Sequence, residues 1–144
     1  LNIDAILNYD IDMVYYNKIK YGGDITLEDG RVIPNEKLTF DPEPAKSYAF
    51  CSDTIYDESI VPIIEKTTVL YHESTFLDSE EHLAEKTMHA TAKQAAHIAK
   101  QANVEYLILG HYSTRYEKIE RFKEEAETVF TNILLADDGR EFEF

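Results

Sequence analysis

The sequence predicts an α/β fold built around a largely parallel sheet. Short apolar runs rich in Val, Ile, Leu and Tyr recur from residue 47 onward, and amphipathic segments alternate with them. None of these runs approaches the roughly 20 residues that a membrane-spanning helix needs. This alternation is typical of β-α-β units, in which helices cover a sheet of buried parallel strands.

The N-terminal part of the chain predicts local structure of a different kind. The first twenty residues favour helix in part, although their apolar periodicity is weak. Residues 25–27 and 31–33 flank the sequence Glu-Asp-Gly, and an Asp-Gly pair favours a tight hairpin. Residues 35–46 contain Pro42 and Pro44 and predict a loop.

From residue 47 to the end, the chain predicts alternating strands and helices. We expect strands at 47–53, 67–73 and 104–111, and helices at 57–66, 89–102 and 117–130. Residues 131–144 predict two final strands joined by a second Asp-Gly turn.

The segment 89–102 carries the clearest helix signals. Thr91 followed by Gln94 matches a capping box, which satisfies two free N–H groups at the start of a helix. Five alanines form a narrow stripe at helical spacing, at positions 92, 95, 96, 99 and 102. Small residues there allow the helix to lie close to the sheet. His89 falls just before the cap, at the positive end of the helix dipole, where anions are favoured.

Length and composition indicate one soluble globular domain. The chain has 144 residues, 44% of them hydrophobic, and a net charge of −14, which argues against nonspecific adhesion to nucleic acid. A nucleic-acid substrate remains compatible with this charge, because bound cations can hold one phosphate locally. The single cysteine, Cys51, excludes an internal disulfide and favours a reducing, cytoplasmic compartment. Because the chain begins with Leu1, we expect a fragment or a processed product.

Polar side chains gather where the predicted strands end. Asp53 follows the first strand, His72 and Glu73 the second, and His111 the third, while His89 lies in the loop before the helix. The carboxyl ends of parallel strands share one edge, so we expect these side chains to converge there. Two histidines, one aspartate and one glutamate suit zinc or a similar ion, with the remaining carboxylate and imidazole available for proton transfer.

Structural roles compete with this interpretation at each position taken singly. A histidine at a strand end is more often hydrogen-bonded than metal-bound, and an aspartate after a strand often caps a helix. Alternation along the strand predicts that His72 points away from Glu73. Arg115 can pair with a surface acid in the sequence that follows it, and His82 and His97 are expected on exposed helix faces without a role.

Four motifs in this order resemble the C-terminal half of ribonuclease Z. They are CSDT with Asp53, YHESTF with Glu73, MHATAKQAAHIAKQANV with His89, and LILGHYSTRY with His111. That family comprises zinc-dependent endonucleases of the metallo-β-lactamase superfamily, which remove the 3′ trailer from precursor tRNA. The resemblance covers nearly the whole chain. It implies that residues 1–144 form the C-terminal half of a nuclease domain, half of an αββα sandwich with a mixed sheet and helices on one face.

The resemblance also implies roles for individual residues. Asp53 matches an aspartate that bridges two metal ions, and His111 matches the last histidine ligand. Glu73 and His89 match a pair thought to donate a proton to the leaving 3′ oxygen. The implied reaction is hydrolysis of a phosphodiester with two zinc ions.

Two further residues match positions that hold the substrate phosphate, and two depart from the family pattern. Ser113 and Arg115 follow His111, and a guanidinium beside a hydroxyl suits phosphate binding. Gly110 stands where a threonine is usual, and Met88 where a small or aromatic residue is common.

The family's hallmark cluster, His-x-His-x-Asp-His, belongs to the N-terminal half and occurs nowhere in these 144 residues. We therefore expect the chain alone to be inactive and to associate with the missing N-terminal half. The resemblance further implies precursor tRNA as substrate and a homodimer, and the lack of a long apolar run predicts no membrane partner. Two alternatives stay open: a metal-dependent enzyme of the same superfamily acting on another phosphodiester or ester, and a noncatalytic interaction half-domain.

Overall fold

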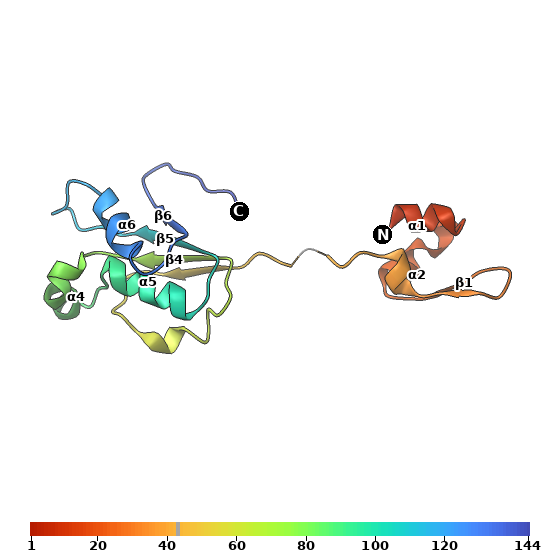
Figure 1. The fold of residues 1–144 in the computed structure, drawn as a ribbon, viewed down its shortest axis with the longest axis horizontal. Coiled ribbons are helices and arrows are strands. Elements are labelled where there is room, and N and C mark those ends of the chain that lie inside the picture. Colours follow the sequence, from red (N-terminus) through yellow and green to blue (C-terminus); the bar gives the residue numbers. More distant parts are fainter. Residues whose placement is uncertain (43) are drawn as a thin grey trace. The chain divides into compact units, whose positions relative to one another are not determined.

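The computed structural model describes residues 1–42 and 44–144 and divides the chain into two compact units (Figure 1). The first unit is Leu1–Pro44 and the second is Ala45–Phe144. Each unit has its own cluster of buried apolar side chains. Within the described residues, no helix is long and apolar enough to cross a membrane.

Short helices and one hairpin build the first unit. Its elements are α1 (Ile3–Asn8), η1 (Met13–Tyr15), α2 (Tyr16–Lys20), β1 (Ile25–Thr26), β2 (Val32–Ile33) and α3 (Asn35–Leu38). Strands β1 and β2 pair antiparallel, which confirms the hairpin predicted at the Asp-Gly turn. Six apolar side chains form the core, namely Ile6, Ile11, Ile19, Ile25, Ile33 and Leu38.

The loop predicted at 35–46 is wrong in its first part, where α3 forms. The side-chain amide of Asn35 donates hydrogen bonds to the carbonyl oxygens of Ile19 and Gly23, at 2.6 and 3.3 Å. Leu38 at the end of α3 is fully buried. The two hydrogen bonds of Asn35 and the burial of Leu38 stabilise a helical turn that the local sequence does not predict. Glu43, which belongs to the same predicted loop, lies outside the described residues.

The second unit contains the α/β fold that the sequence predicts. Its elements are β3 (Tyr48–Cys51), η2 (Glu58–Ile60), β4 (Val69–Glu73), η3 (Asp78–Glu80), α4 (Glu81–Thr87), α5 (Ala92–Gln101), β5 (Tyr106–Gly110), α6 (Glu120–Ala126) and β6 (Ile133–Leu135). The sheet has the order β3-β4-β5-β6, and every neighbouring pair is parallel. Antiparallel pairing within the described residues occurs in the β1–β2 hairpin of the other unit.

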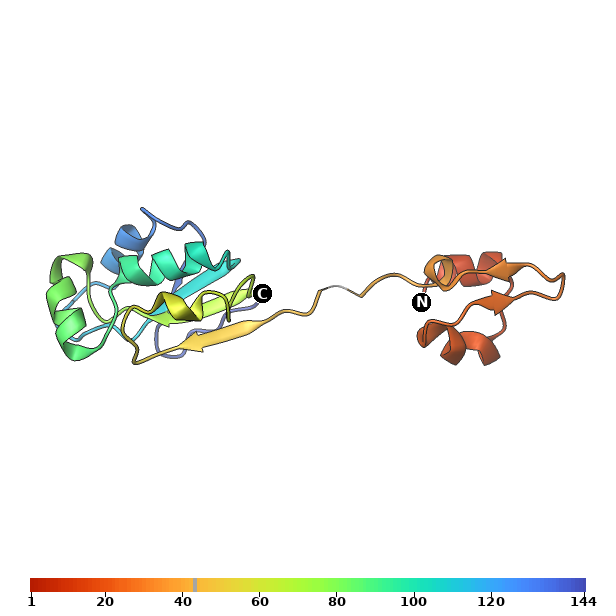
Figure 2. The same ribbon diagram turned by 90° about the horizontal axis from the view of Figure 1, so that it is seen from below.

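Helices α5 and α6 cover one face of this sheet (Figures 1 and 2). The alanine stripe of α5 is fully buried, as predicted, so the helix backbone approaches the strands closely. Leu107 and Leu109 of β5 and Phe122 of α6 belong to the same core and are fully buried. Burying each such side chain contributes roughly 1.5–3 kcal/mol. This packing holds β4 and β5 firmly and thereby fixes the loops at their carboxyl ends.

Two predicted elements differ from the structure. The helix predicted at 57–66 reduces to η2 followed by turns, because Pro62 lacks the N–H that a continuing helix requires. The second of the two final strands is wrong, since only β6 forms in residues 131–144. Beyond β6 the chain turns back, and the ring of Phe144 lies 5.1 Å from that of Tyr106. Aromatic packing rather than a strand ladder therefore places the last residues.

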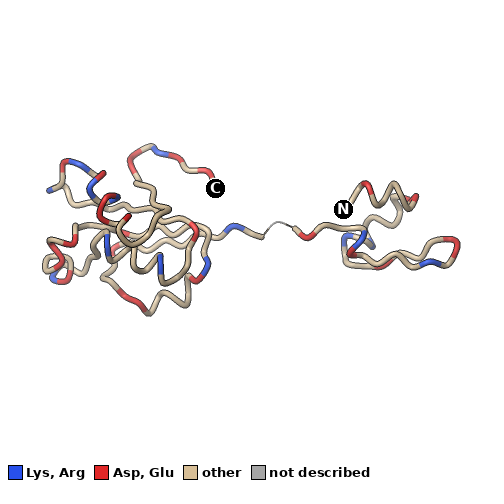
Figure 3. The backbone as a smooth tube through the Cα atoms, viewed as in Figure 1, with Lys and Arg blue, Asp and Glu red and all other residues tan. Residues whose placement is uncertain are grey.

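Acidic residues dominate the charge of the chain. Of the charged side chains, 28 are Asp or Glu and 14 are Lys or Arg. Figure 3 shows both signs spread along both units, without a continuous basic track over the described residues. Broad electrostatic binding to nucleic acid is therefore disfavoured, and a phosphate would need a local site.

Candidate active site

The candidate site lies at the carboxyl edge of the parallel sheet in the second unit. Asp53 stands two residues after β3, Glu73 ends β4, and His111 directly follows β5. The register of β4 and β5 sets Glu73 opposite Gly110, the residue before His111. His89 comes from the loop between α4 and α5. The strand alignment thus gathers residues that are far apart in sequence, as predicted.

Backbone hydrogen bonds tie the loops of this edge together. Ser74 donates its N–H to the carbonyl of Gly110 at 2.8 Å, and Ser113 donates to the carbonyl of Thr75 at 3.0 Å. Phe76 forms an isolated bridge with Thr91 at the start of α5. The loop after β4 is therefore held between the loop after β5 and the N-terminus of α5. Side chains on all three loops keep fixed positions as a result.

Glu73 is the centre of the hydrogen-bond network. Its side chain is fully buried, and its two oxygens accept five hydrogen bonds. Oε1 accepts from the N–H of Thr54 at 2.9 Å and from Nδ1 of His89 at 2.7 Å. Oε2 accepts from the N–H and hydroxyl of Thr75, at 3.2 and 2.6 Å, and from the N–H of Ala90 at 3.2 Å. Every acceptor direction of the carboxylate is thereby used.

The network decides the charge of Glu73. Burial acts to raise the pKa of this carboxyl, but the hydrogen bonds from Thr75, His89 and Ala90 together outweigh it and lower the pKa below its ordinary value. Glu73 is therefore an anion at neutral pH. An anion in this position fixes the orientation of the His89 ring and favours a proton on its Nδ1.

Three side chains form the rim of the site, which we define as Asp53, His89 and His111. One ligand atom from each lies within 4.8 Å of the others. Nε2 of His111 is 3.3 Å from Oδ1 of Asp53, and the rings of His89 and His111 are 5.2 Å apart. Imidazole nitrogens and a carboxylate oxygen are ligands that zinc takes in proteins. The rim residues therefore fit a metal ion.

The backbone at two rim residues is unusual. Asp53 has φ of 50° and His111 has φ of 60°, in the left-handed region that residues other than glycine rarely adopt. Strained residues of this kind persist where their surroundings hold them and tend to occur at functional sites. Here Nδ1 of His111 contacts the hydroxyl of Thr75 at 2.8 Å. This contact holds the His111 ring at the edge of the sheet.

Ser113 and Arg115 lie beside the rim and contact each other. Nε of Arg115 donates to the hydroxyl of Ser113 at 3.2 Å, and its guanidinium lies 5.1 Å from the centre of the Phe76 ring. The Phe76 ring is in turn 6.4 Å from that of His89. Arg115 also forms an ion pair with Glu80 at 3.2 Å. A surface acid therefore does pair with Arg115, although it precedes the arginine in the sequence.

The other histidines stay apart from the rim. The ring of His72 is fully buried, and its Nδ1 donates to the carbonyl of Glu73 at 2.7 Å. Burial lowers the pKa of His72, so its ring is neutral. Among the described residues, its Nε2 is a buried atom without a hydrogen-bond partner. His82 and His97 are exposed on α4 and α5, as predicted.

The chain is similar to known proteins in sequence and in fold. No protein-family model matches the chain. The chain is 45% identical over 138 residues to ribonuclease Z of Porphyromonas gingivalis, and the alignment covers 96% of this chain and 45% of that protein. The chain is therefore similar to ribonuclease Z over nearly its whole length. It spans less than half the length of this curated relative.

Solved structures give the same fold. The metallo-β-lactamase fold protein YhfI from Bacillus subtilis matches with a TM-score of 0.62 and 25% identity, over 67% of this chain and 39% of that protein. A long-form RNase Z from yeast matches with a TM-score of 0.56 and 25% identity, over 63% of this chain and 12% of that protein. The predicted metallo-β-lactamase fold is confirmed.

The structure explains one departure from the ribonuclease Z pattern. A Cβ atom added at Gly110 would overlap the ring and hydroxyl of Tyr71 on the neighbouring strand. Tyr71 thus fills the space that the usual threonine would occupy. Met88, the other departure, ends α4 with φ of 63° and is exposed. Glycine is the residue that best tolerates this position at a helix end.

Sequence reasoning missed part of the Glu73 network. Thr54 and Ala90 act through backbone N–H groups, which no residue type reveals. Thr75 carried a usable signal, because a hydroxyl two residues after a carboxylate often forms a local hydrogen bond. Its contact with His111, 36 residues away, depends on the pairing of β4 and β5.

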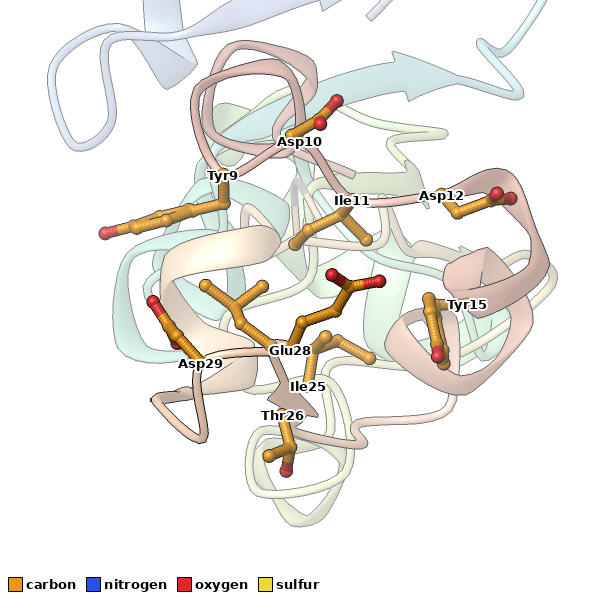
Figure 4. A pocket seen from close by; sticks show the side chains of 10 residues that line it. Tyr9, Asp10, Ile11, Asp12, Tyr15, Ile25, Thr26, Glu28 and Asp29 are labelled. Carbon is orange, nitrogen blue, oxygen red and sulfur yellow. The ribbon is translucent and has the colours of Figure 1, made fainter.

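A separate hollow lies on the first unit (Figure 4). It measures about 380 Å³ and is lined by Tyr9, Asp10, Ile11, Asp12, Tyr15, Ile25, Thr26, Leu27, Glu28 and Asp29. Its acidic residues are exposed, and none of the residues predicted for the site lines it. The hollow is therefore distinct from the candidate active site.

Proposed function

We propose that this chain supplies one side of the active site of an endonuclease that removes the 3′ trailer from precursor tRNA. The observation that carries the proposal is the rim of Asp53, His89 and His111, held by the buried Glu73 in a chain similar to ribonuclease Z. A convergence of metal-binding and proton-transfer groups at one sheet edge suits phosphodiester hydrolysis.

Asp53 and His111 are the proposed ligands for zinc. Their facing atoms, Oδ1 and Nε2, are 3.3 Å apart, so a cation bound at both would offset the carboxylate charge. Zinc held by these two residues would supply a Lewis acid for the phosphate oxygens and would lower the pKa of a bound water. A complete site with two ions needs further ligands, which the resemblance assigns to the N-terminal half.

His89 is the proposed proton donor to the leaving 3′ oxygen. Its Nδ1 is bound to Glu73, which leaves Nε2 available to carry a proton. The anionic Glu73 accepts the Nδ1 hydrogen bond and fixes the direction of the ring, as a buried carboxylate does for a catalytic histidine. His89 also lies within reach of the metal ligands, so its role needs a direct test.

Zinc binding separates the two roles of His89. In the full-length enzyme, His89→Ala should retain zinc and lose cleavage, whereas Asp53→Asn should lose both. Loss of zinc from His89→Ala would instead assign this histidine to the metal. Glu28→Gln, an exposed acid outside the site, is the control and should change neither quantity.

Arg115 and Ser113 are proposed to bind the substrate phosphate. In the free chain the guanidinium pairs with Glu80 and lies over Phe76, so the substrate phosphate would compete with the Glu80 carboxylate. Lysine offers a charge but no planar fork, so Arg115→Lys should weaken substrate binding more than it weakens metal binding. The measurement is KM for precursor tRNA beside zinc content.

The N-terminal half of the enzyme is the proposed partner of the second unit. Tyr48 and Phe50 of β3 are exposed by 61% and 64%, and Phe50 stacks on Tyr71 at 4.7 Å. Exposed aromatic side chains on a strand are expected to pack against another part of the domain. A homodimer, which the resemblance implies, and a cytoplasmic location, which the single cysteine favours, complete the proposal.

Cleavage of precursor tRNA tests the proposed function. We expect a full-length enzyme containing this sequence to release the 3′ trailer in the presence of zinc. We expect residues 1–144 alone to be inactive, because they offer only two of the proposed metal ligands, Asp53 and His111, and lack the His-x-His-x-Asp-His cluster. Cleavage by the isolated 144 residues would overturn this account of the site.

A further inference from the structure

We infer that the hydroxyl of Thr75 is a positioning group that sets the tautomer of His111 and couples it to the Glu73–His89 pair. The inference deepens the proposed function and rests on it, because it gives Thr75 a role in the same site. Oγ1 of Thr75 lies 2.6 Å from Oε2 of Glu73 and 2.8 Å from Nδ1 of His111. One buried hydroxyl thus joins the proposed acid pair to a proposed metal ligand.

The direction of each hydrogen bond follows from the available protons. Oε2 of Glu73 already accepts N–H groups from Thr75 and Ala90, so it is an acceptor. The hydroxyl of Thr75 has a single proton, and the contact at 2.6 Å directs it to Glu73. The hydroxyl oxygen can then only accept from His111. Nδ1 of His111 therefore carries a proton, and its Nε2 is left as the ligand atom.

The same logic applies to the other rim histidine. Nδ1 of His89 faces Oε1 of Glu73, which also accepts the N–H of Thr54. Both rings therefore direct Nδ1–H inward to one carboxylate, His89 directly and His111 through Thr75. A histidine that binds a metal usually donates its second ring N–H to a fixed acceptor, which sets the tautomer and the ring direction. Thr75 supplies that acceptor for His111.

A purely local role for Thr75 does not account for these contacts. A hydroxyl that only stabilised the turn after β4 would need Glu73 and no second partner. The contact with His111 joins residues 36 positions apart, and it restrains a residue with φ of 60°. The side chain is 7% exposed, so water competes little for the hydroxyl.

Isosteric substitution in residues 1–144 tests the inference without nuclease activity. Thr75→Val keeps the shape and removes the hydroxyl, whereas Thr75→Ser keeps the hydroxyl. Thr67→Val is the matched control, since Thr67 is 8% exposed and donates to the carbonyl of Ile64 at the other end of β4. The first readout is the exchange-protected Nδ1 proton of His111 in the NMR spectrum of the ¹⁵N-labelled chain. The second is the affinity of the chain for zinc, measured by titration.

We expect the protected Nδ1 proton of His111 in the native chain, in Thr75→Ser and in Thr67→Val. Thr75→Val should lose this proton and bind zinc about 10–100-fold more weakly. A retained proton in Thr75→Val would overturn the inference, and so would an equal loss of zinc affinity in Thr75→Ser. The His89 proton bound to Glu73 should persist in Thr75→Val, which verifies that the variant is folded.

The test of Thr75 can succeed or fail independently of the proposed function. Suppose that the Nδ1 proton depends on Thr75 while the full-length enzyme does not cleave precursor tRNA. The assigned substrate would then be wrong, and the role of Thr75 toward His111 would stand. If cleavage occurs and the proton is independent of Thr75, the inference alone fails.

Discussion

The two units use carboxylates in opposite ways. In the first unit, Asp10, Asp12, Glu28 and Asp29 line a hollow and are exposed to solvent. In the second, Glu73 is fully buried and accepts five hydrogen bonds. Exposed acids are hydrated at little cost, whereas a buried carboxylate persists only when every oxygen is satisfied. The burial and hydrogen bonding of an individual carboxylate therefore indicate a site better than the number of acidic residues does.

The largest expected effect on stability comes from removing the Glu73 carboxylate. Glu73→Leu leaves the donors of Thr54, Thr75, His89 and Ala90 without their acceptor, so we expect the second unit to lose about 3–5 kcal/mol. Urea unfolding followed through NMR signals of β4 measures this change. Glu28→Leu is the matched substitution in the first unit and should leave the unfolding of β4 unchanged. Equal midpoints for the two variants would remove the contrast between the units.

Lowering the pH should destabilise the second unit through protonation of Glu73. The pKa of Glu73 is lowered in the folded state, so its contribution to stability is present above the unfolded value of about 4.5 and is lost as pH falls through the folded pKa. We expect the unfolding midpoint of β4 to fall with acidification below that value. Glu73→Gln, which cannot titrate at this position, should show a smaller dependence, and an identical pH profile would contradict the assignment.

A clash at Gly110 should cost less than the loss of Glu73. Gly110→Thr restores the usual family residue but forces it against Tyr71, and overpacking of this kind costs about 1–3 kcal/mol. Pairing it with Tyr71→Ala should recover part of the loss, because the ring that clashes is gone. A double-mutant cycle on unfolding midpoints measures the coupling. Strict additivity would show that Tyr71 is not the obstacle.

The smallest effect is expected at the end of α4 and has the opposite sign. Met88 adopts φ of 63° at the helix end, where glycine is not strained. We expect Met88→Gly to stabilise the second unit by about 0.5–1 kcal/mol. Glu85→Gly, inside the same helix, is the control and should destabilise it by a similar amount of about 0.5–1 kcal/mol. A loss of stability in both variants would contradict a strained Met88.

The sequence predicted the parts of the molecule that local pattern determines. The strands, the capping box at Thr91 and the loop position of His89 follow from short-range signals, and parallel pairing then predicts that Asp53 and His111 meet. The helix α3 escaped prediction because Asn35 makes its decisive hydrogen bonds to residues more than ten positions away. The network around Glu73 was not predicted, because three of its five donors are backbone N–H groups. Both features depend on contacts between residues far apart in the sequence, which residue identity alone does not reveal.

Precursor tRNA cleavage by a full-length enzyme carrying Glu73→Gln tests the central claim most directly. If Glu73 orients His89 for proton transfer, the single-turnover rate should fall by about 10²–10⁴-fold while bound zinc stays unchanged. Glu28→Gln, in the acidic hollow, should cleave at the native rate. Native cleavage by Glu73→Gln would contradict the account, because the sheet edge would then not be the place where the leaving oxygen receives its proton.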